Sequence, residues 1–141
     1  MQLSWAKRSG LCEMAGKYEV GVEGRVIVIR CIGAWDRPLR EEFLGVLDET
    51  IDGLPPGKPW ATLVDFTAFQ LAADDTLDVA RKAVALCEAR GRAHGAFMIG
   101  SLDVGQAMIE RQVIDRGKVN VRHFQNEKRA REWLAELGYF T

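Results

Sequence analysis

The sequence lacks a long apolar run, and its positive and negative charges nearly cancel. No apolar stretch approaches the roughly 20 residues that a membrane-spanning helix needs, and no signal-peptide core follows Lys7 and Arg8. A net charge of −1 argues against bulk attraction to nucleic acid or to an anionic membrane. We therefore expect a cytoplasmic protein that neither binds nucleic acid nor inserts into a membrane.

Residues that commonly build reactive sites are scarce. The chain has three serines, two histidines and three cysteines in 141 residues. Cys12, Cys31 and Cys87 are widely spaced and odd in number, which favours buried or incidental thiols in a reducing compartment over a disulfide framework. No spacing of cysteine and histidine matches a zinc site. We expect no metal and no cofactor.

What the sequence does contain is an alternation of strand-like and helix-like apolar patterns, with Gly or Pro at most joints. Period-two or fully apolar runs predict five strands, and helical periodicity predicts four helices. The predicted strands cover 18–23, 26–29, 60–65, 96–99 and 120–124, and the predicted helices cover 37–54, 76–90, 104–116 and 127–137. We therefore predict an α/β fold in which a mixed five-stranded sheet is flanked by four helices.

The first two predicted strands set one edge of this sheet. Glu23 and Gly24 have the composition of a tight hairpin turn, so the strands beside them are expected to be antiparallel. The first strand alternates apolar and polar residues, as an edge strand with one solvated face does. Residues 1–16 are predicted to form an irregular arm, and residues 17–141 a single domain.

Acidic residues stand where the first two predicted helices begin. Asp36 is a suitable N-cap for the first, and Asp74 and Asp75 precede the second, where carboxylates are favourable. With Asp78 the latter pair forms the densest carboxylate group of the chain. Helix capping is its ordinary explanation, and a role in binding a metal or a charged ligand is the alternative. Residues 36–78 hold ten acidic and three basic side chains. These charges make the helix surfaces soluble, or, as the alternative, they form an acidic patch that binds a basic partner.

Ligands of sheets with parallel strands tend to bind beyond the carboxyl ends of those strands. Trp35 lies in such a loop and is the tryptophan we consider for a pocket. Ser101 lies at a strand-to-helix joint, but its neighbours do not form the G-x-S-x-G turn of a nucleophile, so a helix cap explains it. The predicted strand-end loops are 33–36, 66–75, 100–103 and 125–126.

No catalytic or nucleotide-binding signature is present. The segment 53–58 resembles a P-loop only faintly, because its spacing is wrong and Pro59 stands where a helix should open. His123 lies on the last predicted strand, where we expect it to pack at the sheet edge and not to act as a base. Because acids, bases and nucleophiles are few, an enzyme is the least favoured interpretation.

Four segments, in this order and at this spacing, resemble one known group of proteins. They are Val28 to Trp35, Leu63 to Thr67, Val121 to Phe124 and Ala130 to Leu134. With them the chain, from about Tyr18 to Leu137, resembles the STAS-like group, in particular the small bacterial SpoIIAA-like proteins. The resemblance implies a mixed sheet flanked by helices and a non-enzymatic regulatory role that depends on a protein partner. Some similar proteins are proposed to hold a lipid or a nucleotide.

In the anti-sigma-factor antagonists of this group, a serine within an Asp-Ser-Ser-Gly motif is phosphorylated at the start of the second helix. The corresponding residues here are Ala73, Asp74, Asp75 and Thr76, which include neither serine nor glycine. The resemblance therefore does not carry the serine switch over to this chain. One hypothesis is that the two aspartates keep the site permanently acidic and mimic the phosphorylated state.

We expect a non-catalytic STAS-like regulatory or protein-interaction module whose binding surface is the strand-end loops and the start of the second helix. The alternative is a small-ligand or lipid-binding carrier with an apolar pocket around Trp35, Asp65, Phe69 and Gly100. A homodimer is compatible with either. The candidate binding residues are Trp35, Asp65, Thr67, Phe69, Asp74, Asp75, Gly100 and Ser101.

Overall fold

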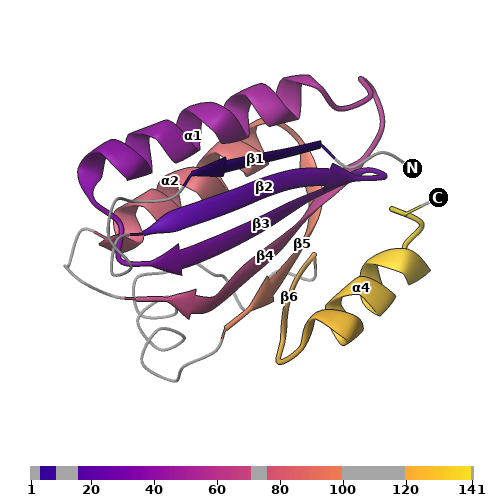
Figure 1. The fold of residues 1–141 in the computed structure, drawn as a ribbon. Helices are drawn as coiled ribbons and strands as arrows, with labels where there is room; N and C mark the ends of the chain where they lie inside the picture. Colours follow the sequence, from indigo (N-terminus) through magenta and orange to yellow (C-terminus); the bar gives the residue numbers. More distant parts are fainter. Residues whose placement is uncertain (1–3, 9–15, 71–75, 100–119, 141) are drawn as a thin grey trace.

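The computed structural model describes residues 4–8, 16–70, 76–99 and 120–140 (Figure 1). These residues form six strands and three helices. The predicted helix over 104–116 lies outside the described residues. The elements are β1 (Ser4–Arg8), β2 (Lys17–Glu23), β3 (Val26–Gly33), α1 (Arg37–Asp52), β4 (Trp60–Phe69), α2 (Thr76–Ala89), β5 (Arg92–Met98), β6 (Val121–Phe124) and α4 (Glu127–Glu136).

A mixed sheet with the strand order β1-β2-β3-β4-β5-β6 forms the centre of the fold. Strands β1 to β3 are antiparallel neighbours, and β3 to β6 are parallel. The five predicted strands are present as β2 to β6. The arm that was expected to be irregular supplies one more strand, because Ser4–Arg8 pairs with β2. β2 is therefore not an edge strand, since its outer backbone groups are paired with β1.

Helices α1 and α2 cover one face of the sheet, and α4 covers the opposite face (Figure 1). The central strand β3 serves both cores. Ile27 and Ile29 pack against the side of α1 and α2, whereas Val26 and Val28 pack on the side of α4. This alternation explains why that run of the sequence is apolar throughout.

Helix α1 begins as its sequence predicts. The Asp36 carboxylate accepts a hydrogen bond from the backbone N–H of Leu39 at 2.9 Å, which satisfies one of the free donors of the first turn. Its buried residues recur at four-residue intervals and point toward the sheet. They are Leu39, Phe43, Leu47 and Ile51.

Helix α4 has a capped start and an earlier end than predicted. The side chain of Asn126 accepts a hydrogen bond from the N–H of Arg129 at 2.9 Å. Ala130 and Leu134 are buried as expected. Leu137 was predicted to belong to the buried face, but it is 41% exposed, because the helix ends at Glu136 and residue 137 is already its C-cap.

Two strands extend beyond their predicted limits. β4 continues from the predicted end at Asp65 to Phe69, because its last residues still pair with Ile32 and Gly33 of β3. Thr67 and Phe69 therefore lie in a strand and not in a loop. β5 begins at Arg92, four residues before the predicted start. Within the described part of the chain, no helix is long and apolar enough to cross a membrane.

Candidate functional site

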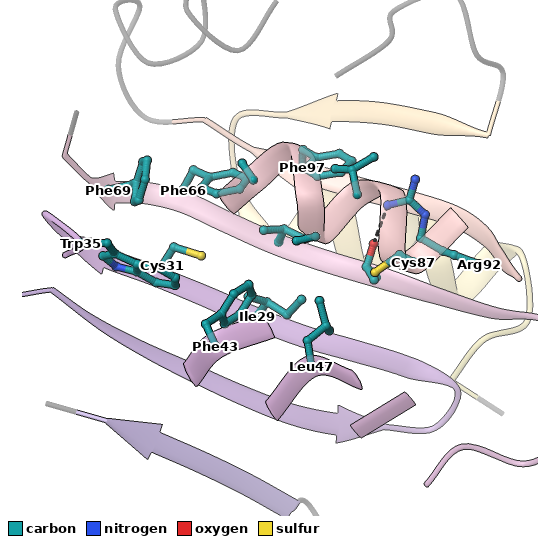
Figure 2. Close-up of a pocket in the computed structure, with 15 residues that line it drawn as sticks. Ile29, Cys31, Trp35, Phe43, Leu47, Phe66, Phe69, Cys87, Arg92 and Phe97 are labelled. Carbon is teal, nitrogen blue, oxygen red and sulfur yellow. Dashed lines mark hydrogen bonds between the residues drawn. The ribbon is translucent and has the colours of Figure 1, made fainter. Parts of the chain in front are cut away.

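A small cavity lies in the core between the sheet and the helices α1 and α2 (Figure 2). Its free volume is about 30 Å³, which is room for roughly one or two water molecules. Side chains of β3, β4, β5 and both helices line it. Figure 2 shows Trp35 and Phe69 at one end of the lining and Arg92 at the opposite end. The cavity is thus apolar along most of its length and charged at one end.

The aromatic end is a packed cluster around Trp35. The Trp35 ring lies 5.1 Å from the ring of Phe43 and 6.0 Å from that of Phe69, both in edge geometry. Tyr18 completes the cluster at 5.9 Å. Trp35 Nε1 donates a hydrogen bond to the carbonyl of Ile32 at 3.0 Å. Because its polar atom is satisfied and it is buried, Trp35 offers the cavity only an apolar surface.

The opposite end is occupied by the guanidinium of Arg92. Its side chain is 2% exposed. Nη1 donates to Oγ1 of Thr62 at 3.5 Å, the long limit of a hydrogen bond, and Nη2 lies 3.5 Å from Oε1 of Glu88. Cζ lies 5.8 Å from the centre of the Phe97 ring. Among the described residues, neither Nε nor Nη2 has a hydrogen-bond acceptor.

Burial dominates the electrostatics of Arg92. It lowers the pKa of the guanidinium, because the charged form loses its hydration; the nearby Cys87 and Glu88 act in the opposite direction but more weakly. Arginine nevertheless remains charged at neutral pH. The cavity therefore contains a positive charge with incomplete hydrogen bonding.

The two described thiols line the same cavity. Burial raises the pKa of Cys31 far above the usual range of thiols, and the charge of Asp65 acts in the same direction. Burial also raises the pKa of Cys87 to about 11, although the positive charge of Arg92 partly opposes it. Both thiols are protonated at neutral pH, so neither is an activated nucleophile.

An irregularity in strand pairing brings Arg92 to this face. Trp60 pairs with Arg92, but the next residue, Ala61, pairs with His94, so one residue of β5 is skipped. Arg92 therefore shares the face of Trp60 and Thr62, which looks toward α1 and α2. Strict alternation back from Phe97 would have placed it on the other face.

Asp65 and Thr67 come together, but outside the cavity lining. Oδ1 of Asp65 accepts hydrogen bonds from the backbone N–H of Thr67 at 2.8 Å and from its hydroxyl at 2.5 Å. Both partners belong to the end of β4, and Thr67 is exposed. This local hydrogen bonding occupies one oxygen of the carboxylate and fixes the end of the strand.

The remaining predicted site residues, Asp74, Asp75, Gly100 and Ser101, lie outside the described residues. Of the four residues proposed for a carrier pocket, Trp35 and Phe69 line the cavity and Asp65 does not.

Sequence reasoning missed the charged end of the cavity. Arg92 lies four residues before the predicted start of the fourth strand, so it was not predicted to belong to the sheet. Thr62 and Cys87 lie within a predicted strand and a predicted helix, and neither was predicted to belong to a site. A charged residue, Arg92, and a glycine, Gly95, next to the apolar run of a central strand could have indicated a buried charge. The residue of β5 that is skipped in the pairing could not be predicted, because no sequence pattern marks it.

A second titratable pair lies on the opposite face of the sheet. Nδ1 of His94 is 2.5 Å from the hydroxyl of Tyr139, and the His94 ring packs against Trp133 with centroids 5.6 Å apart. Burial lowers the pKa of His94, because the charged imidazolium loses hydration. In the part of the chain that the structure describes, no three His, Cys, Asp or Glu side chains are grouped as a metal site requires.

Comparison with known proteins identifies the fold. No protein-family model matches the chain, and no curated protein does. Among solved structures, the anti-sigma factor antagonist SpoIIAA in its unphosphorylated form has a TM-score of 0.61 at 13% identity, covering 94% of this chain and 97% of that one. An uncharacterized DUF3478-family protein with a SpoIIAA-like fold from Shewanella loihica PV-4 has a TM-score of 0.56 at 13% identity, covering 94% and 93%. The chain therefore has a SpoIIAA-like fold.

Proposed function

We propose that this protein is a non-catalytic, STAS-like regulatory module that acts by binding a protein partner. The observation that supports the proposal is the likeness to SpoIIAA, an anti-sigma factor antagonist, over 94% of the chain. The chemistry of the described residues agrees with it, because the two thiols of the core are protonated and Asp65 is engaged with Thr67. We also propose that the protein is located in the cytoplasm.

The surface proposed for the partner is the carboxyl end of β4. Thr67 and Ala68 are exposed there, and Asp65 holds the backbone of Thr67 in place. The residues that follow in the sequence include Asp74 and Asp75, which we propose replace a phosphorylated serine with permanent negative charge. Under this proposal the partner presents basic groups to these aspartates.

Site-specific crosslinking in the native host tests the surface. A photo-crosslinking amino acid replaces the exposed Ala68, and a matched variant carries it at Glu49, which is exposed on α1. We expect a discrete crosslinked protein from position 68 that is absent from position 49. Equal products at both positions, or none at position 68, contradict the proposed surface.

The proposed role of the two aspartates has its own test. If Asp75 contributes constant negative charge, Asp75→Ser weakens binding of the crosslinked partner, and phosphorylation of the new serine restores it. If Asp75→Ser changes neither partner binding nor stability, Asp75 neither supplies the negative charge that the partner binds nor stabilises the fold.

A second candidate function is supported by the cavity. We propose as the alternative a carrier of a small ligand, because apolar side chains enclose a space that ends at an incompletely hydrogen-bonded arginine. Native mass spectrometry of freshly purified protein separates the two candidates. A stoichiometric adduct that leaves on denaturation favours the carrier and gives the mass of its ligand. A clean monomer or dimer favours the interaction module and gives its assembly state.

A further inference from the structure

A solvent-open cleft lies between β6 and the outer side of α4. Its free volume is about 390 Å³, more than ten times that of the core cavity. The basic residues of its lining are Arg122 of β6 and Lys128 and Arg129 of α4, and all three are exposed. The cleft therefore has room for a ligand, and its cations are accessible to one.

Two aromatic rings hold the guanidinium of Arg122 at this cleft. Its Cζ lies 5.5 Å from the centre of the Phe124 ring and 5.5 Å from that of the Trp133 ring, and the two ring centres are 5.6 Å apart. Such contacts engage the flat surface of a guanidinium and leave the N–H groups at its rim free to donate. Arg122 is thus a positioned cation whose hydrogen-bonding capacity is not used within the described residues.

The three cations of the cleft lack acidic partners. In the part of the chain that the structure describes, no carboxylate lies within ion-pair distance of Arg122, Lys128 or Arg129. By contrast, Arg131 on another side of the same helix pairs with Glu127. Lys128 and Arg129 also lie in the first turn of α4, where the helix dipole disfavours positive charge. An anion bound in the cleft would offset both effects.

Two carboxylates limit the kind of anion that the cleft accepts. Glu132 and Glu136 line it one and two turns further along α4 than Lys128, so the positive charge is concentrated at the end next to the helix start. A long polyanion would extend past the cations and meet these carboxylates. A compact group with two negative charges fits the basic end. A phosphate monoester has this charge, and its oxygens accept hydrogen bonds from guanidinium and ammonium groups.

The basic end of the cleft lies at the same edge of the sheet as the proposed partner surface. β4, β5 and β6 are parallel, and Met98 of β5 pairs with Asp65 of β4 on one side and with Phe124 of β6 on the other. The end of β6 is therefore level with the part of β4 that leads to Thr67. Because the cations are exposed, the cleft does not enclose a ligand as a small-molecule pocket does. This exposure favours a phosphate that the partner itself carries.

We propose that the cleft between β6 and α4 binds a phosphorylated side chain of the protein partner. Arg122 anchors the phosphate, and Lys128 and Arg129 supply the remaining positive charge. The assignment rests on the proposed partner-binding function and adds a chemical group that the partner must present. This contact is separate from the one proposed for Asp74 and Asp75, to which the same partner presents basic groups.

The direct test is a titration of the protein with short peptides, followed in ¹⁵N-correlated NMR spectra. The probes are capped alanine peptides whose central residue is phosphoserine, glutamate or serine. Ionic strength is equal throughout and the pH is near 7.5, where phosphoserine carries about two negative charges. The reporter is the indole N–H signal of Trp133, identified by its loss in Trp133→Phe. We expect the phosphoserine peptide to shift this signal at lower concentration than the glutamate peptide, and the serine peptide to leave it unchanged.

Matched variants locate the binding in the cleft. Arg122→Met removes the anchoring charge from an exposed side chain and should raise the Kd of the phosphoserine peptide about tenfold, the usual effect of losing hydrogen bonds to a charged group. Arg37→Met is the control, because Arg37 is 81% exposed on α1, which covers the opposite face of the sheet (Figure 1). It should leave the Kd unchanged. Glu132→Gln should lower the Kd, because it removes a carboxylate from the lining.

The outcomes separate the phosphate site from the proposed function. No shift with the phosphoserine peptide, an equal shift with the glutamate peptide, or an unchanged Kd in Arg122→Met overturns the site. Tighter binding of glucose 6-phosphate or of a single-stranded oligonucleotide than of the phosphoserine peptide overturns a phosphorylated partner as its ligand. If position 68 still gives a crosslinked partner, these results leave the proposed function standing. Phosphoserine binding that depends on Arg122, without a crosslinked partner from position 68, supports the site and contradicts the proposed partner surface.

Discussion

Gly95 and Arg92 are matched across the skipped residue of β5: the guanidinium Nη1 lies 3.1 Å from where a β-carbon on residue 95 would stand. A methyl group on residue 95 would therefore crowd both the guanidinium and the Phe97 ring, which lies 3.2 Å from the same position. The absence of a side chain at residue 95 therefore provides the space in which the charged Arg92 side chain lies beside the cavity.

We expect Gly95→Ala to lower the free energy of unfolding by about 1–3 kcal/mol, the usual effect of overpacking a core. Urea denaturation measures it. Gly45→Ala is the control, since a methyl group there meets nothing within 4 Å and Gly45 lies inside helix α1; it should add roughly 0.5–1 kcal/mol. If crowding of the guanidinium is the cause, Arg92→Met in the Gly95→Ala background restores most of the loss. A loss of equal size in that double variant contradicts this explanation.

His94 should make stability depend on pH. Its pKa is lowered in the folded protein, where burial disfavours the imidazolium and Tyr139 and Trp133 surround the ring. The unfolded chain therefore takes up a proton first as the pH falls, and stability decreases from the unfolded pKa of about 6.5 down through the folded pKa. The thermal midpoint should fall over this window in the wild-type protein.

His94→Gln is the variant that checks the assignment. It should have a lower midpoint at pH 8, because the contact with the Tyr139 hydroxyl changes, and a smaller loss between pH 7.5 and 5. Parallel pH profiles of the two proteins would mean that other groups cause the dependence.

Gly24→Ala should destabilise the protein through two effects. Gly24 has φ of 60°, and a methyl group there would lie 2.5 Å from the carbonyl oxygen of Tyr139, which accepts the backbone N–H of Arg25. Gly57→Ala isolates the first effect, because Gly57 has φ of 76° and nothing within 4 Å. The backbone change alone costs roughly 1–2 kcal/mol. We expect the unfolding free energy of Gly24→Ala to fall below that of Gly57→Ala, and equal losses would show that the contact with the C-terminal segment is unimportant.

Cys87 should react slowly with thiol reagents in the folded protein. A pKa raised to about 11 from the ordinary 9.0 lowers its thiolate fraction at neutral pH by roughly 100-fold, and burial slows access further. Alkylation followed by peptide mass spectrometry resolves this residue from the other cysteines. The rate should keep rising with pH to about 11 in folded protein. A plateau near pH 9 would show that Cys87 is solvated.

Several elements were predictable because their signals are local. The Asp36 cap and the four-residue spacing of Leu39, Phe43 and Leu47 predict α1, and each depends only on near neighbours in the chain. The apolar run at the start of β3 predicts a strand buried on both faces, and the composition of Glu23 and Gly24 predicts its hairpin with β2. The resemblance to SpoIIAA-like proteins predicted the fold that the solved structures support.

The sequence by itself therefore determined helices α1, α2 and α4, the central strands and the burial of β3 on both faces. Only the tertiary structure decided that Ser4–Arg8 closes the edge of β2, because strand pairing over such a separation depends on a partner's free backbone groups and not on local pattern. It also buried Trp35 among aromatic rings and turned Arg92 into the cavity. A single skipped residue in a strand pairing reverses which face a side chain occupies, and that choice is made by the packing of β4 against β5.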